Sequence, residues 1–276
     1  MTLVYSLFLT AMTAMSMEIM ILLLIIALVG GVCITTIGPG GIFVTIALFA
    51  LLPLSPSTVA GTASATFIAT GIVGSLGYLH SGELKGKIAG KAAGVLSLTS
   101  VIGAFAGAQI NTLLDASLFA ILLGLFVFFT GILILYRQKK QLKPDSRLQI
   151  DSFKGLAWLA GVGLAVGLPG GLLGVGGPVL AVPFMVILGV PMLLSVALAQ
   201  VQSIFISGFA TFGYMIHGAV DWYLALFLTV PLLIGTISGW YIAQRIKASK
   251  LQVSLALVLI ALGIYLVAGG VTPGGA

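Results

Sequence analysis

The sequence predicts an all-α integral membrane protein, a helical bundle built as an inverted repeat. Of the 276 residues, 60% are hydrophobic and only 7% are charged, and the mean hydropathy is +1.25. Apolar runs of helical length recur along the chain, whereas strands of an outer-membrane barrel would alternate apolar and polar residues over about ten positions. Two Gly-rich segments interrupt these runs. We therefore expect two broken or re-entrant helices and about six to ten membrane crossings.

The first broken helix follows an apolar run, residues 19–37, that is long enough to cross a membrane, while residues 1–16 stay unassigned. Glycine allows the chain to turn and proline removes a backbone donor, so Gly38-Pro39-Gly40-Gly41 interrupts the helix. The apolar piece that follows, residues 42–52, rises only about 16 Å, half of a bilayer. Irregular backbone at membrane depth must line protein or a cavity, so this segment is a candidate binding site.

Three longer helices complete the first half, at about 58–79, 92–108 and 116–136. The first has a polar face, made by Thr58, Thr62, Thr66 and Thr70. Glycines at four-residue spacing follow, and this pattern predicts close contacts between membrane helices: Gly86, Gly90, Gly94, Gly103 and Gly107. We interpret 137–154 as a hydrophilic cytoplasmic linker between a first membrane repeat, 1–136, and a second, inverted one, 155–276.

The second half repeats the first at a constant offset of 136 positions. Gly38, Gly40 and Gly41 correspond to Gly174, Gly176 and Gly177, and Gly77-Tyr78 corresponds to Gly213-Tyr214. The order of features corresponds as well: a Gly-rich break, a short helix ending at a proline, a polar-faced helix and two plain spans. Agreement in order as well as in single residues favours an internal duplication.

Charge predicts how the two repeats lie in the membrane. All twelve Lys and Arg residues fall in three clusters, at 85–91, 137–154 and 245–250, and the positive-inside rule places these on the cytoplasmic side. The loops at 109–115 and 217–222 carry no cation, so we expect them, with both termini, to be external. Equivalent loops then lie on opposite sides of the cytoplasmic membrane, which makes the repeats inverted.

Inverted repeats with helices broken near the membrane midplane are typical of secondary transporters. Because no Lys or Arg lies within a predicted span, an anionic substrate would be held by neutral side chains and by the N–H groups that begin a helix. The candidate substrate-binding residues come from the two breaks and the two polar-faced helices: Gly40, Gly41, Thr62, Ser64, Thr66, Gly176, Gly177, Gln200, Gln202 and Ser203. For each Ser or Thr hydroxyl, the alternative to substrate binding is a hydrogen bond to a backbone carbonyl of its own helix.

The segment Gly167 to Pro183, with its core GLLGVGGPVLAVP, is followed by a short helix and a polar-faced helix, and it resembles the signature of the sulfite exporter TauE/SafE family, also called the TSUP membrane transporter family. Both halves of the chain have that layout. The first half departs from the usual glycine run at Pro39, and Pro178 stands where a third glycine is common. The resemblance implies export or uptake of small anions such as sulfite, sulfoacetate or related organosulfur acids.

The expected function is therefore secondary transport of a small anion by alternating access, with an anion channel of the same architecture as the alternative. An enzyme is disfavoured because no Asp, Glu or His lies within a predicted span and Cys33 has no such neighbour in sequence. We expect no cofactor, no metal and no nucleic acid. The expected partners are the anion and the lipid bilayer, and a homo-oligomer is compatible with the sequence. The anion, the direction of transport and any coupling ion stay open.

Overall fold

The computed structural model describes residues 16–140, 152–245 and 249–269, and within them every regular element is a helix. Seven of the helices are long and apolar enough to cross a membrane. The all-helical membrane bundle predicted from the sequence is confirmed. In chain order the helices are α2 (Met17–Thr36), α3 (Gly41–Leu51), α4 (Pro56–Ser81), α5 (Lys87–Asn111), α6 (Ala116–Lys140), α7 (Phe153–Leu173), α8 (Pro178–Ile187), α9 (Met192–Met215), α10 (Trp222–Ala243) and α11 (Ser249–Val267).

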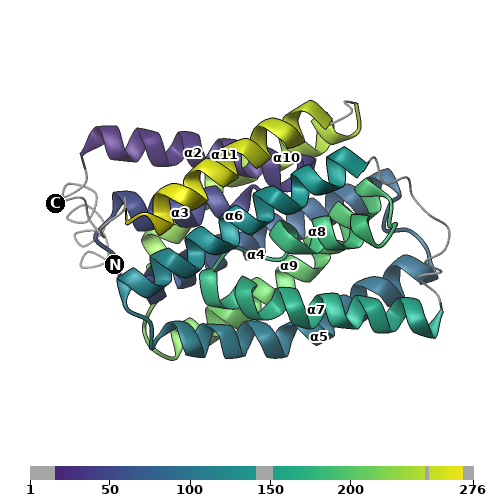
Figure 1. Ribbon diagram of the computed structural model, residues 1–276, viewed down its shortest axis with the longest axis horizontal. Coiled ribbons are helices and arrows are strands. Elements are labelled where there is room, and N and C mark those ends of the chain that lie inside the picture. The colour runs from purple at the N-terminus through teal and green to yellow at the C-terminus, as the bar shows by residue number, and fades with distance from the viewer. Residues whose placement is uncertain (1–15, 141–151, 246–248, 270–276) are drawn as a thin grey trace, which may run out of the picture.

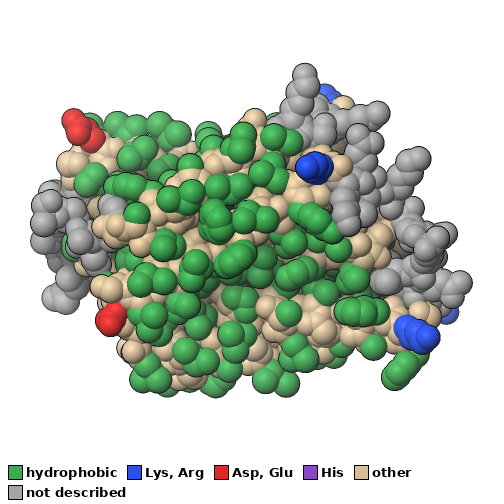
Figure 2. All heavy atoms as spheres, in the orientation of Figure 1, with side chains coloured by type: hydrophobic (Ala, Val, Ile, Leu, Met, Phe, Trp, Pro, Cys, Tyr) green, Lys and Arg blue, Asp and Glu red, His purple; other side chains and the backbone are tan. Residues whose placement is uncertain are grey.

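The long helices run along the length of the molecule, and α2 begins at the same end where α11 finishes (left in Figure 1). Acidic side chains are visible at this end and Lys and Arg side chains at the opposite end, with an apolar surface between them (Figure 2). This separation is what the positive-inside rule expects of a protein that spans a bilayer. We call the end with the start of α2 the outer end and the other the inner end. The predicted lead-in, residues 1–16, lies almost entirely outside the described residues.

Each Gly-rich segment ends a long helix and starts a short one that turns back toward it. A Cβ on Gly30 of α2 would lie 3.1 Å from Gly40 O and 3.6 Å from Val44 of α3, so the short helix doubles back along α2. In the second half, a Cβ on Gly170 of α7 would lie 3.5 Å from Gly176 O. Both breaks are therefore hinges between a long helix and a half-length helix, as predicted. We call residues 37–40 the first hinge and residues 174–177 the second hinge.

The packing of the two halves shows the same correspondence as their sequences. Helix α2 packs along α10, and their equivalents α7 and α5 pack along each other, while α4 and α9 cross at the centre. The Tyr78 hydroxyl donates to Thr35 O at 2.5 Å and the Tyr214 hydroxyl donates to Gly171 O at 2.8 Å. These two bonds join residues that are equivalent at the 136-residue offset. This is the pattern that a duplication predicts, and the division into 1–136, 137–154 and 155–276 stays a prediction.

Two sequence-based expectations about the helices need correction. Helix α6 extends past the predicted end at 136 as far as Lys140, so Arg137 lies within a helix and is buried, and its Nη1 donates to Met192 Sδ at 3.5 Å. Only part of the glycine series makes close helix contacts. Gly103 and Gly107 pack against the backbone of α7, whereas a Cβ on Gly90 or Gly94 would meet open space.

Candidate functional site

The two hinges meet at one small cavity in the middle of the bundle, which we call the hinge cavity. Its lining residues come from both hinges, from the helix ends beside them and from α4 and α9, and every one of them is buried: Ile34, Gly38, Gly41, Phe67, Thr70, Val175, Gly176, Pro178 and Ser203. The cavity offers about 10 Å³ to the centre of a water-sized sphere, which is room for about one water molecule. The conformation described here is therefore closed around the site.

Two helix N-termini face this cavity. Gly41 begins α3 and Pro178 begins α8, and both line the cavity. The first N–H groups of a helix have no partner within the helix, and each helix N-terminus carries a partial charge of about +0.5. Pro178 lacks an N–H, but at the first position of a helix that group would have no intrahelical partner in any case. Since no lining residue is Lys or Arg, the two helix N-termini are the groups in the lining that carry partial positive charge.

Of the side chains that line the cavity, only Ser203 and Thr70 carry a hydroxyl group. Thr70 Oγ1 donates to Phe67 O at 3.1 Å, so its proton is engaged within α4. Ser203 lies beside the second hinge, where a Cβ on Gly176 would come within 3.2 Å of Ser203 Oγ. An anion in the cavity accepts hydrogen bonds and offers none, so Ser203 is the hydroxyl suited to bind it.

The two candidate glutamines lie on different sides of α9, because residues two apart on a helix are separated by about 200°. Gln200 Nε2 donates to Ile34 O at 3.1 Å and thereby ties α9 to α2. Gln202 lies beside the second hinge, where a Cβ on Gly177 would be 3.4 Å from its Oε1. Gln202 is fully buried, and neither its Oε1 nor its Nε2 has a hydrogen-bond partner. Its amide is therefore available to a ligand at the start of α8.

Among the ten predicted site residues, the structure brings Gly41, Gly176 and Ser203 to the cavity wall. Gly40 faces away from it, since a Cβ there would meet Gly30 O and Cys33 of α2. Thr62 Oγ1 accepts from the backbone N–H of Asp221 at 3.0 Å, and this bond closes the outer end.

Two further candidates and one glycine lie near the cavity without lining it. Thr66 Oγ1 donates to Ala63 O at 2.7 Å, which is the backbone-bonded alternative. Ser64 is buried on the same helix. Gly177 packs against α9, where a Cβ would lie 3.3 Å from Ser203 N.

The cavity also has lining residues that the sequence did not single out as ligands, above all Phe67. Phe67 and Ser203 are 136 residues apart, so they occupy the same position in the two repeats. That offset is the signal that could have found Phe67. Within the described residues, no group of three or more His, Cys, Asp or Glu side chains is placed to hold a metal ion.

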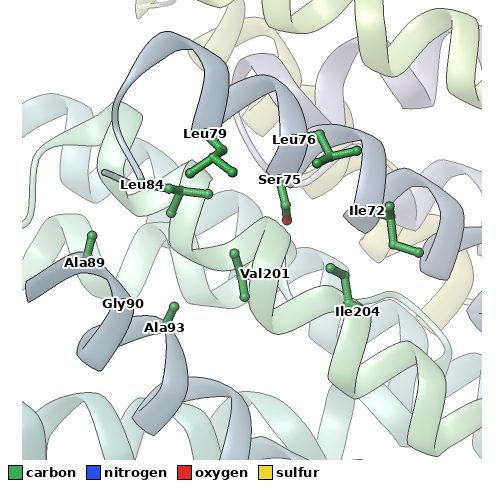
Figure 3. Close-up of a pocket in the computed structure, with 10 residues that line it drawn as sticks. All are labelled: Ile72, Ser75, Leu76, Leu79, Leu84, Ala89, Gly90, Ala93, Val201 and Ile204. Atoms are coloured by element: carbon green, nitrogen blue, oxygen red, sulfur yellow. The ribbon is translucent and has the colours of Figure 1, made fainter. Parts of the chain in front are cut away.

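A second, larger hollow of about 320 Å³ lies toward the inner end. It is a groove with α9 as its floor, from which Val201 and Ile204 project, and with α4 and the start of α5 as its walls (Figure 3). We call it the inner groove. Ser75 is the only residue with a polar side chain in its lining. A groove of this composition does not by itself hold an anion.

Comparison with known proteins gives the chain its family. The family model "Sulfite exporter TauE/SafE" matches residues 5–266. The probable membrane transporter protein YunE of Bacillus subtilis is 26% identical over 273 residues, covering 91% of this chain and 98% of that protein. The probable membrane transporter protein YdhB of the same organism is 28% identical over 226 residues, covering 81% of this chain and 89% of that protein. No solved structure matches. The chain belongs to the sulfite exporter TauE/SafE family, whose members are membrane transporters and not enzymes.

Proposed function

We propose that this transporter carries a small sulfur oxyanion, such as sulfite or sulfoacetate, across the cytoplasmic membrane by alternating access. In this proposal the anion is bound in the hinge cavity. The basic loops at the inner end face the cytoplasm, while the start of α2 and the end of α11 lie on the external side. The observation that carries the proposal is the convergence of two helix N-termini on one buried cavity, at Gly41 and Pro178.

The chemistry of the cavity supports an anion of this kind. The starts of α3 and α8 line the cavity together with Ser203 of α9, and Gln202 lies next to this lining, beside Gly177. Oriented backbone dipoles suit anions without a fixed cation. A sulfur oxyanion presents several acceptor oxygens at once, so it can bond to donors from both hinges. The bound anion then holds the two halves of the protein together.

Alternating access is favoured over an open pore by the closure of the site. The lining residues are all buried and leave room for about one water molecule. An anion larger than water can therefore enter the hinge cavity only when the protein adopts a conformation in which the hinges have moved apart. A channel would need a water-filled path in its conducting state, and its flux would not saturate.

Reconstituted vesicles test the function. Radiolabelled sulfite uptake should rise with sulfite concentration and saturate, and unlabelled sulfite should compete with the label. Ser203→Ala should raise the apparent KM about tenfold or more, because a hydrogen bond to a charged group contributes about 1.5 to 3 kcal/mol. Thr70→Val is the matched control, since the Thr70 proton already bonds Phe67 O, so its KM should stay near that of the parent. Flux that rises linearly with sulfite would favour the channel, and no flux would reject this substrate.

A further inference from the structure

Unpartnered polar atoms concentrate on the two helices that cross at the hinge cavity. Eight buried side-chain polar atoms among the described residues have no hydrogen-bond partner, and six of these belong to α4 or α9. The residues on these helices are Ser75, Gln200, Gln202, Ser207 and Thr211. An unsatisfied buried polar group costs about 1 to 3 kcal/mol and is uncommon in folded proteins. A cost concentrated on these two helices of a transporter points to a function of these groups.

Three threonines on other helices show the usual alternative, whereas Ser97 Oγ of α5 has no partner. Thr130 Oγ1 donates to Phe126 O at 2.7 Å, Thr229 Oγ1 to Ala225 O at 2.7 Å, and Thr236 Oγ1 to Leu232 O at 2.8 Å. This bond to the preceding turn is open to Ser and Thr in a membrane helix. Ser207 and Thr211 do not make it. Their hydroxyl groups are available to water or to a solute whenever the neighbouring helix moves away.

The row of hydroxyls on α9 starts at the hinge cavity. Ser203, Ser207 and Thr211 follow each other at four-residue spacing, so they lie along one face of the helix. Ser203 lines the cavity, and Thr211 lies one turn before the outer end of α9. All three are buried, whereas Phe205, Phe209 and Phe212 are exposed. The row therefore leads through the protein interior from the cavity toward the outer end.

The first repeat carries the same feature in the opposite direction. Thr211 corresponds to Ser75 at the 136-residue offset, and Ser75 Oγ is also buried without a partner. The Ser75 side chain points from α4 toward α9, at the inner groove (Figure 3). The groove is lined at one end by Leu84, next to the exposed cation Lys85. An inverted repeat would use equivalent positions on opposite sides of the cavity.

We propose that Ser207 and Thr211 form the outer half, and Ser75 the inner half, of the route by which the anion reaches the hinge cavity. This inference rests on the proposed function. In the closed state the three hydroxyls have no partner. When α4 and α9 separate on one side, the hydroxyls on that side face water and replace part of the hydration shell of the passing anion.

Cysteine accessibility tests the route in a Cys33→Ser background. The probe is 2-sulfonatoethyl methanethiosulfonate, a membrane-impermeant sulfonate; the cysteine thiolate attacks its thiosulfonate sulfur, forms a disulfide and releases methanesulfinate. Ser207→Cys and Thr211→Cys should react when the reagent is added at the outer end, and Ser75→Cys when it is added at the inner end. The matched control for Ser207 and Thr211 is Ile206→Cys, which is equally buried but packs against Gly170 of α7.

The expected difference in labelling rate follows from how often each cysteine becomes accessible to the reagent. A minor open state is populated at about 0.1 to 10%, whereas a packed interface opens only by local unfolding, so the route cysteines should react about tenfold or more faster than Ile206→Cys. Equal rates for the route positions and the control would overturn the proposal, as would labelling of Ser75→Cys from the outer end. Sulfite protection is a separate readout: fast labelling that sulfite does not slow counts against sulfite as the substrate and leaves the route intact.

A second variant covers the case in which the cysteine proteins fold poorly. Thr211→Val keeps the shape of the side chain and removes the unpartnered hydroxyl. If Thr211 lines the route, the transport rate should fall several-fold while the Tm of the purified protein stays equal or rises. A lower Tm with an unchanged transport rate would show a structural role and overturn the assignment.

Discussion

The two hinges are equivalent in sequence position but differ in what surrounds them. The first hinge packs its glycine backbone against α2, since a Cβ on Gly40 would meet Gly30 O and Ile34 N. The second hinge packs against α4 and α9: a Cβ on Gly174 would meet the backbone of Ala60, and a Cβ on Gly176 would approach the side chains of Ser203 and Phe67. The nearest neighbours of Gly38 and Gly40 in the first hinge are therefore backbone atoms and the side chains of Val182 and Cys33. The second also has polar side chains beside it.

The backbone conformation of the hinges differs in the same sense. Gly38 and its equivalent Gly174 both have positive φ, 107° and 62°. At the next equivalent pair, Gly40 has φ −79°, whereas Gly176 has φ 74°. Pro39 precedes Gly40, and Val175 precedes Gly176. The proline is therefore found beside the glycine with negative φ, a conformation that any residue can adopt. We infer that the duplicated hinge has specialised, with structural support in the first copy and ligand recognition in the second.

Gly40→Ala should have the largest effect on stability. The new methyl group would overlap backbone atoms of α2, which cannot move away as a side chain can, so we expect a loss of about 3 kcal/mol or more and poor expression. Gly176→Ala should lower the Tm less, because its nearest neighbour is the Ser203 hydroxyl at 3.2 Å and the left-handed φ costs about 1 to 2 kcal/mol. Thermal melts of the two purified proteins give the two Tm values. If Gly40→Ala is more stable than Gly176→Ala, the roles of the two hinges are reversed.

Gly176→Val should abolish sulfite transport, since both the strained φ and the contact with Ser203 affect the site directly. Gly124 in α6 is unsuitable as a control because it packs tightly against α11, where a Cβ would lie 2.8 Å from Val267. Gly208→Val is the better control, because a Cβ there meets open space on the same helix as Ser203. Transport rates in vesicles are the measurement. Similar losses in both variants would mean that the second hinge is ordinary packing.

The two glutamines should separate binding from folding. Gln202→Leu removes two unpartnered buried polar atoms, so the ligand-free Tm should stay equal or rise, while the Kd for the anion should increase about five- to hundredfold. Gln200→Leu removes the bond to Ile34 O and should lower the Tm by a measurable amount. Melting curves with and without sulfite report both quantities. A Gln202→Leu protein with lower Tm and unchanged Kd would mean that this glutamine only joins helices.

Thr62→Val should have the smallest effect. It removes the acceptor for the Asp221 N–H at the outer end, a loss of about 0.5 to 1.5 kcal/mol. Because Thr62 lies at the outer closure and not at the cavity, the Kd for the anion should stay within about twofold of the parent. A large increase in Kd would return Thr62 to the substrate site.

The sequence was sufficient for the helices, the hinges and the 136-residue correspondence, because hydropathy and glycine spacing are local signals. It also identified Gly41, Gly176 and Ser203, which line the cavity. It did not separate Gln200 from Gln202, because their roles depend on which helix each side chain faces. Nor did it distinguish Gly124, which packs against α11, from Gly208, which meets open space. Packing partners come from tertiary contacts, which residue type does not reveal.

The most direct test of the central claim is equilibrium binding of sulfite to the purified parent protein and to the double variant Gln202→Leu/Ser203→Ala. Sulfite should raise the Tm of the parent, since a ligand at a hundredfold excess over its Kd stabilises the native state by about 2.7 kcal/mol. The double variant should keep the ligand-free Tm of the parent and lose this stabilisation. If sulfite stabilises both proteins equally, the hinge cavity is not the binding site, and if it stabilises neither, sulfite is not the ligand.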